Sequence, residues 1–179
     1  MRLLLFAAAA LMLLSGGEAR ADCTDPPQPG VQWRRCYFDG REFRDSDLKG
    51  AQLRDATFQR ADLRGSDLSR ADAYRAKFIS ADLRKARFDE ANLAEADFTR
   101  ADLAGASFRG ADLRRTRFFR ADLRDADFTG ARMSGADLLN ADLSGATWTD
   151  GQRICAEGSV GQCQDGAAPK PQSGLLNLR

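Results

Sequence analysis

Apolar residues recur at every fifth position of this chain. From Phe38 to Trp148, the central residue of 23 consecutive pentads is apolar, without a single insertion. A small residue, mostly Ala, stands two positions before every centre except Phe43, which has Arg41 there. Asp is frequent between them, as in Ala61-Asp62-Leu63 and Ala96-Asp97-Phe98. Strict repetition of this kind predicts a solenoid, in which each repeat packs only against its neighbours.

A period of five fits neither an amphipathic helix nor a continuous alternating strand. Residues two apart face the same way in extended backbone, so each pentad contributes one large and one small inward residue. A corner must then follow, and Gly, which favours turns, recurs two positions after the centre. The glycines at this position include Gly50, Gly65, Gly105, Gly110, Gly130, Gly135 and Gly145.

These pentads resemble the pentapeptide repeat family over residues 36–150. The stretch from Trp148 to Cys155, followed by Gly158 to Cys163, is similar to the end of exported bacterial members. The resemblance implies an all-β fold, a right-handed, four-sided β-helix with four pentads in each coil. Just under six coils would make a rod about 28 Å long at about 4.8 Å between stacked strands.

With four pentads in each coil, the aromatic centres gather on two opposite sides of the predicted rod. Stacked rings can lie offset at favourable separations, so we expect both columns to belong to the core. One side has the centres Phe38, Phe58, Phe78, Phe98, Phe118 and Leu138, and the opposite side has Leu48, Leu68, Phe88, Phe108, Phe128 and Trp148. The two remaining sides are mostly Leu, from Phe43 to Leu143 and from Leu53 to Met133.

Residues 1–21 are typical of a secretory signal peptide. A short basic start precedes an apolar run from Leu3 to Leu14, and Ala19-Arg20-Ala21 suits cleavage before Asp22. The run is too short to anchor the chain in a bilayer, and Asp22 disfavours lipidation of Cys23. We expect a periplasmic or secreted protein without a membrane span after cleavage.

The exported chain divides into three predicted parts. A Pro-rich N-terminal cap covers residues 22–35, the β-helix covers 36–150, and a C-terminal disulfide loop with a flexible tail covers 151–179. An unprotected terminal edge of stacked strands is prone to aggregation, so a cap at each end is expected.

Four cysteines flank the repeat, and they allow three disulfide pairings. Because a solenoid holds its ends apart, proximity favours Cys23–Cys36 and Cys155–Cys163. Neither pair has metal-binding spacing and the chain has no His, so disulfides are favoured over a zinc site. Disulfides also agree with an exported protein.

The charges are nearly balanced, with 27 Lys and Arg against 26 Asp and Glu. Within residues 36–150 there are 20 basic and 21 acidic residues, so the total charge indicates neither a polyanionic nor a polycationic partner. One column of carboxylates suggests Ca²⁺ binding, but arginines follow it on the same side and turn backbone competes for the carboxylates. We expect no metal and no cofactor. The column consists of Glu42, Asp62, Asp82, Asp102, Asp122 and Asp142.

One outward surface breaks the regular pattern, on the side that runs from Phe38 to Leu138. Ile79, Phe119 and Leu139 follow the centres of this side, where other sides mostly have charged or small residues. Arg100, Arg117 and Arg120 lie beside them, and apolar residues edged by Arg are typical of a recognition surface. Scattered surface hydrophobic residues are the other interpretation.

The sequence favours a non-catalytic exported scaffold or protein-binding module. It has no His, no nucleophile elbow, no phosphate-binding Gly loop and no insertion that would build a cleft. The partner would be a protein or a component of the cell envelope, with no nucleic acid, and a homodimer through the same surface stays open. The resemblance also suggests a DNA mimic that modulates DNA gyrase, although the balanced charge and the export signal disfavour it. A carbohydrate-active β-helix enzyme is the third alternative.

Overall fold

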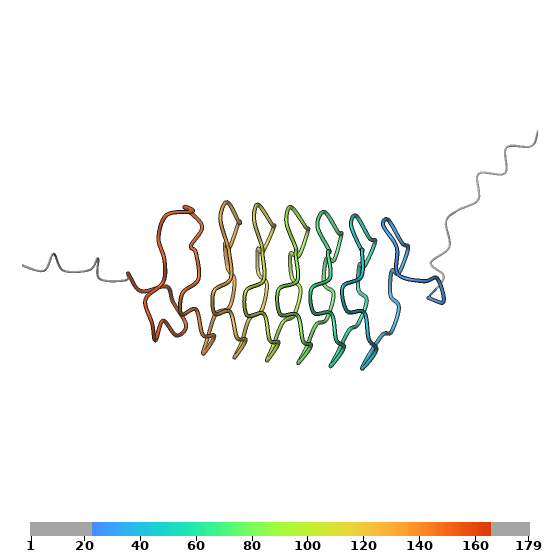
Figure 1. The fold of residues 1–179 in the computed structure, drawn as a ribbon, viewed down its shortest axis with the longest axis horizontal. Helices are drawn as coiled ribbons and strands as arrows, with labels where there is room; N and C mark the ends of the chain where they lie inside the picture. Colours follow the sequence, from blue (N-terminus) through green and yellow to red (C-terminus); the bar gives the residue numbers. More distant parts are fainter. Residues whose placement is uncertain (1–22, 166–179) are drawn as a thin grey trace, which may run out of the picture.

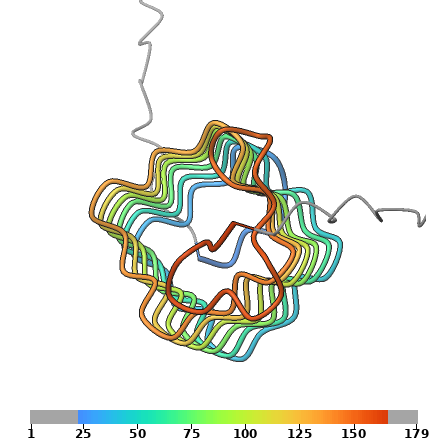
Figure 2. The ribbon, with the colours of Figure 1, turned by 90° about the vertical axis from the view of Figure 1, so that its left-hand side faces the viewer.

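The computed structural model describes residues 23–165, which form a rod of stacked coils (Figure 1). Parallel bridges join residues 20 positions apart, from Gln32↔Gln52 to Asp127↔Thr147. This spacing confirms the predicted coil of four pentads, and Figure 2 shows the four-sided outline along the rod axis. The predicted signal peptide and the predicted flexible tail from residue 166 lie outside the described residues.

The described residues contain no helix and no strand longer than one bridged residue. Each side of a coil has one bridged residue, immediately before the apolar centre, and a two-residue turn follows the centre. The sides are too short for continuous strands because the chain turns a corner in every pentad. The β-structure is therefore built across the coils rather than along the chain.

Every backbone amide of a typical pentad is hydrogen-bonded, as residues 96–100 show. The amides of Asp97, Phe98 and Arg100 donate to carbonyl oxygens of neighbouring coils at 3.0, 2.8 and 2.9 Å. The Ala96 amide closes the preceding turn by donating to a carbonyl oxygen at 2.9 Å. The fifth amide, that of Thr99, donates to the Asp97 side chain at 2.9 Å. This complete pairing explains why Asp is so frequent before the centre.

The corners adopt a left-handed backbone conformation at every fifth residue from Gly30 to Gly145. Fifteen of these residues are not Gly, and Arg100 is one example with φ of 59°. The amide that follows each such corner donates to the carbonyl three residues earlier, as Ala101 does to Phe98 at 2.9 Å. A positive φ only at the third residue makes these type II turns. Non-Gly residues disfavour this conformation, so the hydrogen bonds between coils must offset its cost.

The core is the column of inward residues inside the rod. The side chains of Phe78, Phe98 and Phe118 are completely buried. Their rings stack with centroids 4.9 and 5.3 Å apart, and Phe88 from the opposite side meets Phe98 edge-on at 5.6 Å. The two predicted aromatic columns therefore lie in the core and contact each other across it.

At the N-terminal end, the hydrogen bonds between coils begin earlier than the pentad pattern indicates. Val31 and Trp33 are buried, and Gln32 forms the first bridge, although all three belong to the predicted cap. The inward residues of this pentad are Val31 and Trp33, so the usual Ala is absent and the sequence pattern does not reveal the pentad. Cys23 is joined to Cys36 by a disulfide beside the buried Trp33.

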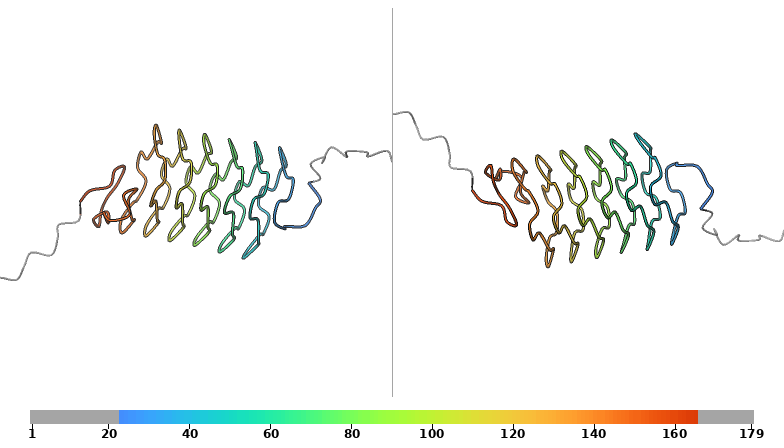
Figure 3. Two further views of the ribbon diagram at one scale, coloured as in Figure 1. Left: turned by 90° about the horizontal axis from the view of Figure 1, so that it is seen from above. Right: turned by 90° about the horizontal axis from the view of Figure 1, so that it is seen from below.

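At the C-terminal end, the chain folds back over part of the last coil (Figure 3). Antiparallel bridges join Thr147 to Ile154 and Asp142 to Val160. A disulfide joins Cys155 to Cys163. Both disulfides have the pairing that proximity favours.

The buried rings should dominate the stability of the rod. We expect Phe98→Ala to lower the free energy of unfolding by about 3–5 kcal/mol, because it leaves a cavity between stacked rings. Phe119→Ala is the matched control one coil away, where the ring is half-buried on the outside, and should cost about 1 kcal/mol or less. Urea denaturation followed by circular dichroism measures both, and equal losses would contradict this account of the core.

Candidate functional site

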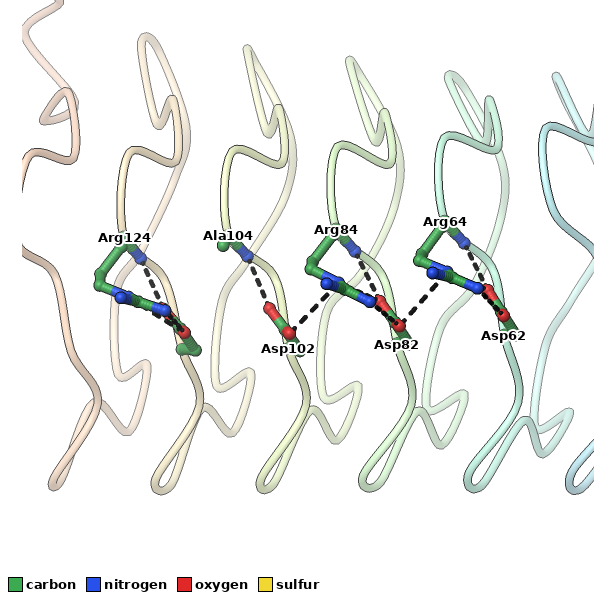
Figure 4. A network of polar contacts seen from close by, with 8 residues as sticks. Asp62, Arg64, Asp82, Arg84, Asp102, Ala104 and Arg124 are labelled. Carbon is green, nitrogen blue, oxygen red and sulfur yellow. Dashed lines mark hydrogen bonds and ion pairs between the residues drawn. The ribbon is translucent and has the colours of Figure 1, made fainter.

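Carboxylates and arginines lie side by side along the side that runs from Phe43 to Leu143, except that Ala104 follows Asp102 (Figure 4). The Arg64 guanidinium donates two hydrogen bonds to Asp62, at 2.9 and 2.7 Å, and also lies 3.4 Å from Asp82 in the next coil. Arg84 repeats the arrangement with Asp82, at 2.9 and 2.6 Å, and lies 3.4 Å from Asp102. Arg64 and Arg84 thus each pair within their own coil and connect to the next, whereas Arg44 pairs only with Asp62 of the next coil.

The carboxylates of this column have a second role in the backbone. Asp62, Asp82 and Asp122 each accept the amide hydrogen of the arginine two residues later, at 3.1–3.4 Å. The side-chain hydrogen bond from Arg64 is the main reason that the pKa of Asp62 lies well below its ordinary value. The neighbouring arginines lower the pKa of Asp82 and Asp122 in the same way.

This pairing leaves little capacity for metal coordination in the carboxylate column. Its oxygens accept hydrogen bonds from guanidinium and backbone groups, which are the contacts that a Ca²⁺ ion would have to displace. Among residues 23–165, no group of three or more His, Cys, Asp or Glu side chains is arranged to hold a metal ion. The four described cysteines are all in disulfides, so the described chain offers no free thiol.

The apolar residues of the predicted partner-binding surface share one column on the Phe38–Leu138 side, but they are unequally exposed. Leu139 is 60% exposed, whereas Ile79 and Phe119 are half-buried. Phe119 and Leu139 occupy neighbouring coils, but Thr99 separates Phe119 from Ile79. The structure therefore supports an apolar pair, with Ile79 set apart, rather than a continuous stripe.

The Lys and Arg residues of the same side lack ion-pair partners more often than those of the other sides. Within the described part of the chain, Arg60, Lys77, Arg100 and Arg120 have no carboxylate oxygen within 4.0 Å. On the opposite side, by contrast, every Lys or Arg is ion-paired, namely Lys49, Arg70, Arg87 and Arg109.

Of the three predicted arginines of this surface, two carry uncompensated charge. Arg117 pairs with Asp97 at 2.6 Å, so its charge is locally balanced. The Arg120 guanidinium lies over the Phe119 ring at 5.1 Å, a cation–π contact that joins the apolar and basic parts of the surface. We call Arg100, Phe119, Arg120 and Leu139 the basic–apolar patch.

Several exposed apolar residues are missing from the sequence-based set. Tyr37 is 79% exposed on the same side as the patch. The sequence signal was available, because the equivalent outward positions of the next two coils are the polar Thr57 and Lys77. Ile154 and Val160 are 51% and 52% exposed in the C-terminal cap. Their exposure depends on the path of the cap, which has no repeat pattern to reveal it.

Two sequence models of pentapeptide repeats match most of the rod. "Pentapeptide repeat region" matches residues 30–108 and 51–128, and "Pentapeptide repeats (8 copies)" matches residues 111–147. The chain belongs to the pentapeptide repeat family. Pentapeptide repeat proteins fold as right-handed, four-sided β-helices, which agrees with the coil described above. The family match begins at residue 30, as the hydrogen bonds between coils do.

Solved pentapeptide repeat structures are similar to this chain in fold. A thylakoid-lumen protein from Arabidopsis thaliana has 20% identity and a TM-score of 0.45, covering 72% of this chain and 84% of its own. HetL from the cyanobacterium Nostoc, involved in heterocyst differentiation regulation, has 28% identity and a TM-score of 0.30, with coverage of 71% and 73%. QnrB1, a plasmid-mediated fluoroquinolone resistance protein, has 22% identity and a TM-score of 0.48, with coverage of 66% and 70%.

No curated protein matches the chain. Among residues 23–165, no helix is long and apolar enough to cross a membrane.

The structural role of the paired carboxylates can be tested at Asp112, which is 8% exposed and lies 2.8 Å from both Arg114 and Arg132. Asp112→Asn keeps an acceptor for the Arg114 amide but removes the charge, so we expect it to cost about 1 kcal/mol. Asp112→Ala also leaves that amide without its acceptor and should cost about 2 kcal/mol. Urea denaturation at pH 7 measures both changes.

The cost of Asp112→Asn should depend on pH in a defined direction. The hydrogen bond from Arg114 lowers the pKa of Asp112 in the folded protein below its usual 3.8. The ionised carboxylate therefore stabilises the fold fully above this value, and the contribution is lost as the pH falls through and below it. The two proteins should differ most at pH 7 and progressively less below pH 3.8, and a difference that grew in acid would contradict the ion-pair account.

Proposed function

We propose that this pentapeptide repeat protein is an exported, non-catalytic binding module that contacts an acidic protein surface through the basic–apolar patch. The single observation that carries the proposal is the local excess of positive charge beside exposed apolar side chains. Arg100 and Arg120 have no carboxylate partner in the described chain, and Leu139 is 60% exposed.

The rod holds this patch at fixed spacing. Arg100 and Arg120 occupy equivalent corners of neighbouring coils, and their amides donate to the Phe119 and Leu139 carbonyl oxygens at 2.9 and 3.1 Å. At about 4.8 Å between coils, the side chains begin from anchored backbone. Anchored backbone limits the entropy lost when a partner binds, and Arg and aromatic residues are enriched at protein interfaces.

Charge complementarity suggests the kind of partner. Uncompensated arginines favour encounter with a negatively charged surface and disfavour a positive one. The Arg120–Phe119 contact and the exposed Leu139 would supply the desolvated part of the interface. A rod of about six coils would offer the patch as one rigid side of a scaffold.

The two disulfides indicate an oxidising, non-cytoplasmic environment. Together with the signal peptide expected at residues 1–21, they support a periplasmic or secreted location. Export would keep the protein away from DNA gyrase in the cytoplasm. The DNA-mimic alternative also needs free negative charge, whereas much of the carboxylate set is paired with arginines, as in the column of Figure 4.

A carbohydrate-active enzyme has less support in the structure. The depressions described on the rod lie between charged side chains of neighbouring coils. One of them is lined by Tyr74, Ala94, Glu95, Arg114, Arg115 and Ser134. Arg115 lies 3.7 Å from Glu95, and Arg114 is paired with Asp112, so this depression does not isolate a pair of carboxylates for acid–base chemistry.

The proposal can be tested by capture of partners from the periplasm or culture medium of the source cells. We expect Ile79→Asp/Phe119→Asp/Leu139→Asp to lose at least about tenfold of the captured partner, because it removes the apolar contacts and adds negative charge beside the arginines. The matched control is Thr129→Asp/Thr149→Asp on the opposite side, half a coil away from Phe119 and Leu139. The control needs no third change, because Asp89 already occupies the position opposite Ile79.

Circular dichroism should first show that both variants are folded. A partner that survives the triple change, or is lost equally from the control, would show that the basic–apolar patch is not the binding surface. Raising the salt concentration should also weaken wild-type binding, since exposed charges are screened.

A further inference from the structure

A depression on the Leu53–Met133 side of the rod lies where a column of outward side chains has a small residue. The residues that follow the centres of this side are mostly long, but Ala94 stands between Tyr74 and Arg114. The depression has a volume of about 380 Å³, at the lower end of the range for small-ligand sites. We call it the Ala94 depression, and it is lined by Tyr74, Ala94, Glu95, Arg114, Arg115 and Ser134.

The gap in this column has room for one six-membered ring. Tyr74 and Arg114 belong to coils two apart, which is about 10 Å at the usual spacing of stacked strands. A flat ring needs roughly 3.5–4 Å on each face for van der Waals contact. A single ring therefore fits between the two side chains with little space left over.

Tyr74 provides an aromatic surface for such a ring. The central guanidinium carbon of Arg54 lies 5.7 Å from the centroid of the Tyr74 ring. Arg54 does not line the depression, whereas Tyr74 does, so the depression borders a part of Tyr74 that Arg54 leaves uncovered. A hydrogen bond with Glu95 raises the pKa of Tyr74, which agrees with a phenol hydroxyl beside the Glu95 carboxylate. Tyr74 thus combines an apolar surface with a polar group at its edge.

The backbone around the depression is anchored by hydrogen bonds between coils. The Arg75 amide donates to the Ala94 carbonyl at 3.1 Å, and the Glu95 and Arg115 amides donate to the next coil, both at 3.0 Å. The Ala94 amide donates to the Asn92 side chain at 3.3 Å. A ligand would therefore bind to a preformed backbone and would order only side chains, which limits the entropy lost on binding.

Positive charge is in excess beside the depression. Arg114 and Arg132 both lie 2.8 Å from the same oxygen atom, Oδ2 of Asp112. Arg115 lies 3.7 Å from Glu95, so these three arginines share two carboxylates. The six pentads of this side, counted from residue 31, contain seven Arg against four Asp and Glu, a net charge of +3. A negatively charged ligand is favoured over a neutral or cationic one.

We propose that the Ala94 depression binds one six-membered sugar ring of an acidic polysaccharide. The C–H groups on one face of the ring would pack against Tyr74. The hydroxyls of a sugar both donate and accept hydrogen bonds, and the rim offers both kinds of partner, because Glu95 accepts, Arg115 donates and Ser134 does either. An apolar aromatic ligand would leave these polar groups without partners. The site lies on a different side from the basic–apolar patch and does not rest on the function proposed above.

Binding to immobilised oligosaccharides tests the proposal. The probes are oligosaccharides of uronic acids, each paired with its carboxyl-reduced form, which keeps the ring and loses the charge. We expect at least one uronic-acid oligosaccharide to bind, and its carboxyl-reduced form to bind about tenfold more weakly, because charged hydrogen bonds are stronger than neutral ones. Polyaspartate, which has carboxylates but no sugar ring, should not compete.

Substitutions at two positions locate the site. Tyr74→Ala should weaken binding about tenfold because it removes the ring, whereas Tyr74→Phe keeps the ring and should stay within about twofold of the wild type. Ala94→Gln should weaken binding at least about tenfold because it fills the depression, and Gln59 shows that this position of a pentad accepts Gln. Ala104→Gln is the matched control, since Ala104 has the equivalent position on the opposite side of the rod.

A further variant separates this proposal from the function proposed above. Ile79→Asp/Phe119→Asp/Leu139→Asp changes another side of the rod and should keep sugar binding within about twofold at 0.15 M salt, where distant charges are screened. Thermal unfolding followed by circular dichroism checks that each variant is folded.

Four results would overturn the proposal. Failure of every uronic-acid oligosaccharide to bind would show that the depression is not a site for this class of ligand. Equal binding of the carboxyl-reduced forms would contradict the acidic class, and competition by polyaspartate would assign the site to an acidic protein. Equal losses from Ala94→Gln and Ala104→Gln would place the binding elsewhere on the rod.

Discussion

The hydrogen bonds between coils are the constraint on which the rest of this structure depends. Each pentad donates three backbone amides to neighbouring coils, and these bonds require that every pentad has the same shape. The left-handed corner follows from this requirement, because the chain must turn after each centre and return in register one coil later. Fifteen non-Gly residues accept that conformation, which indicates how strongly the regular coil outweighs local backbone preference.

The same constraint explains the outside of the rod. A side chain that precedes a centre lies above its equivalent in the previous coil, so like charges would stack along the whole rod. Paired arginines solve this problem on the Phe43–Leu143 side, where Arg64 bridges Asp62 and Asp82. On the Phe38–Leu138 side the compensation is incomplete. A rigid scaffold with one uncompensated side is suited to binding, since its side chains are displayed without the cost of ordering the backbone.

The two ends differ because a coil always has one unsatisfied edge at each terminus. At the N-terminal end, Trp33 and the residues before it bury the first phenylalanines, and a disulfide fixes the segment to Cys36. At the C-terminal end, the cap between residues 151 and 165 pairs with two sides of the last coil, and Leu138 remains on an open side. The open edge is thus a consequence of how far a short disulfide loop can extend.

The sequence alone was sufficient to predict the coil, the core and the disulfides. A strict period of five with one large and one small inward residue predicts a solenoid, and the resemblance to pentapeptide repeats implies four pentads in each coil. Stacking every fourth pentad then places Phe78, Phe98 and Phe118 in one column. The additional pentad at Val31 and Trp33 was hidden because its inward pair departs from the Ala-x-Leu pattern. The tertiary structure was needed to decide which charges are neutralised and which amides lack an acceptor. Some ion pairs join residues two apart, as Arg64 and Asp62 do, but other partners lie 18 or 20 residues away or in the irregular cap. These distant contacts depend on side-chain reach and chain path rather than on the repeat.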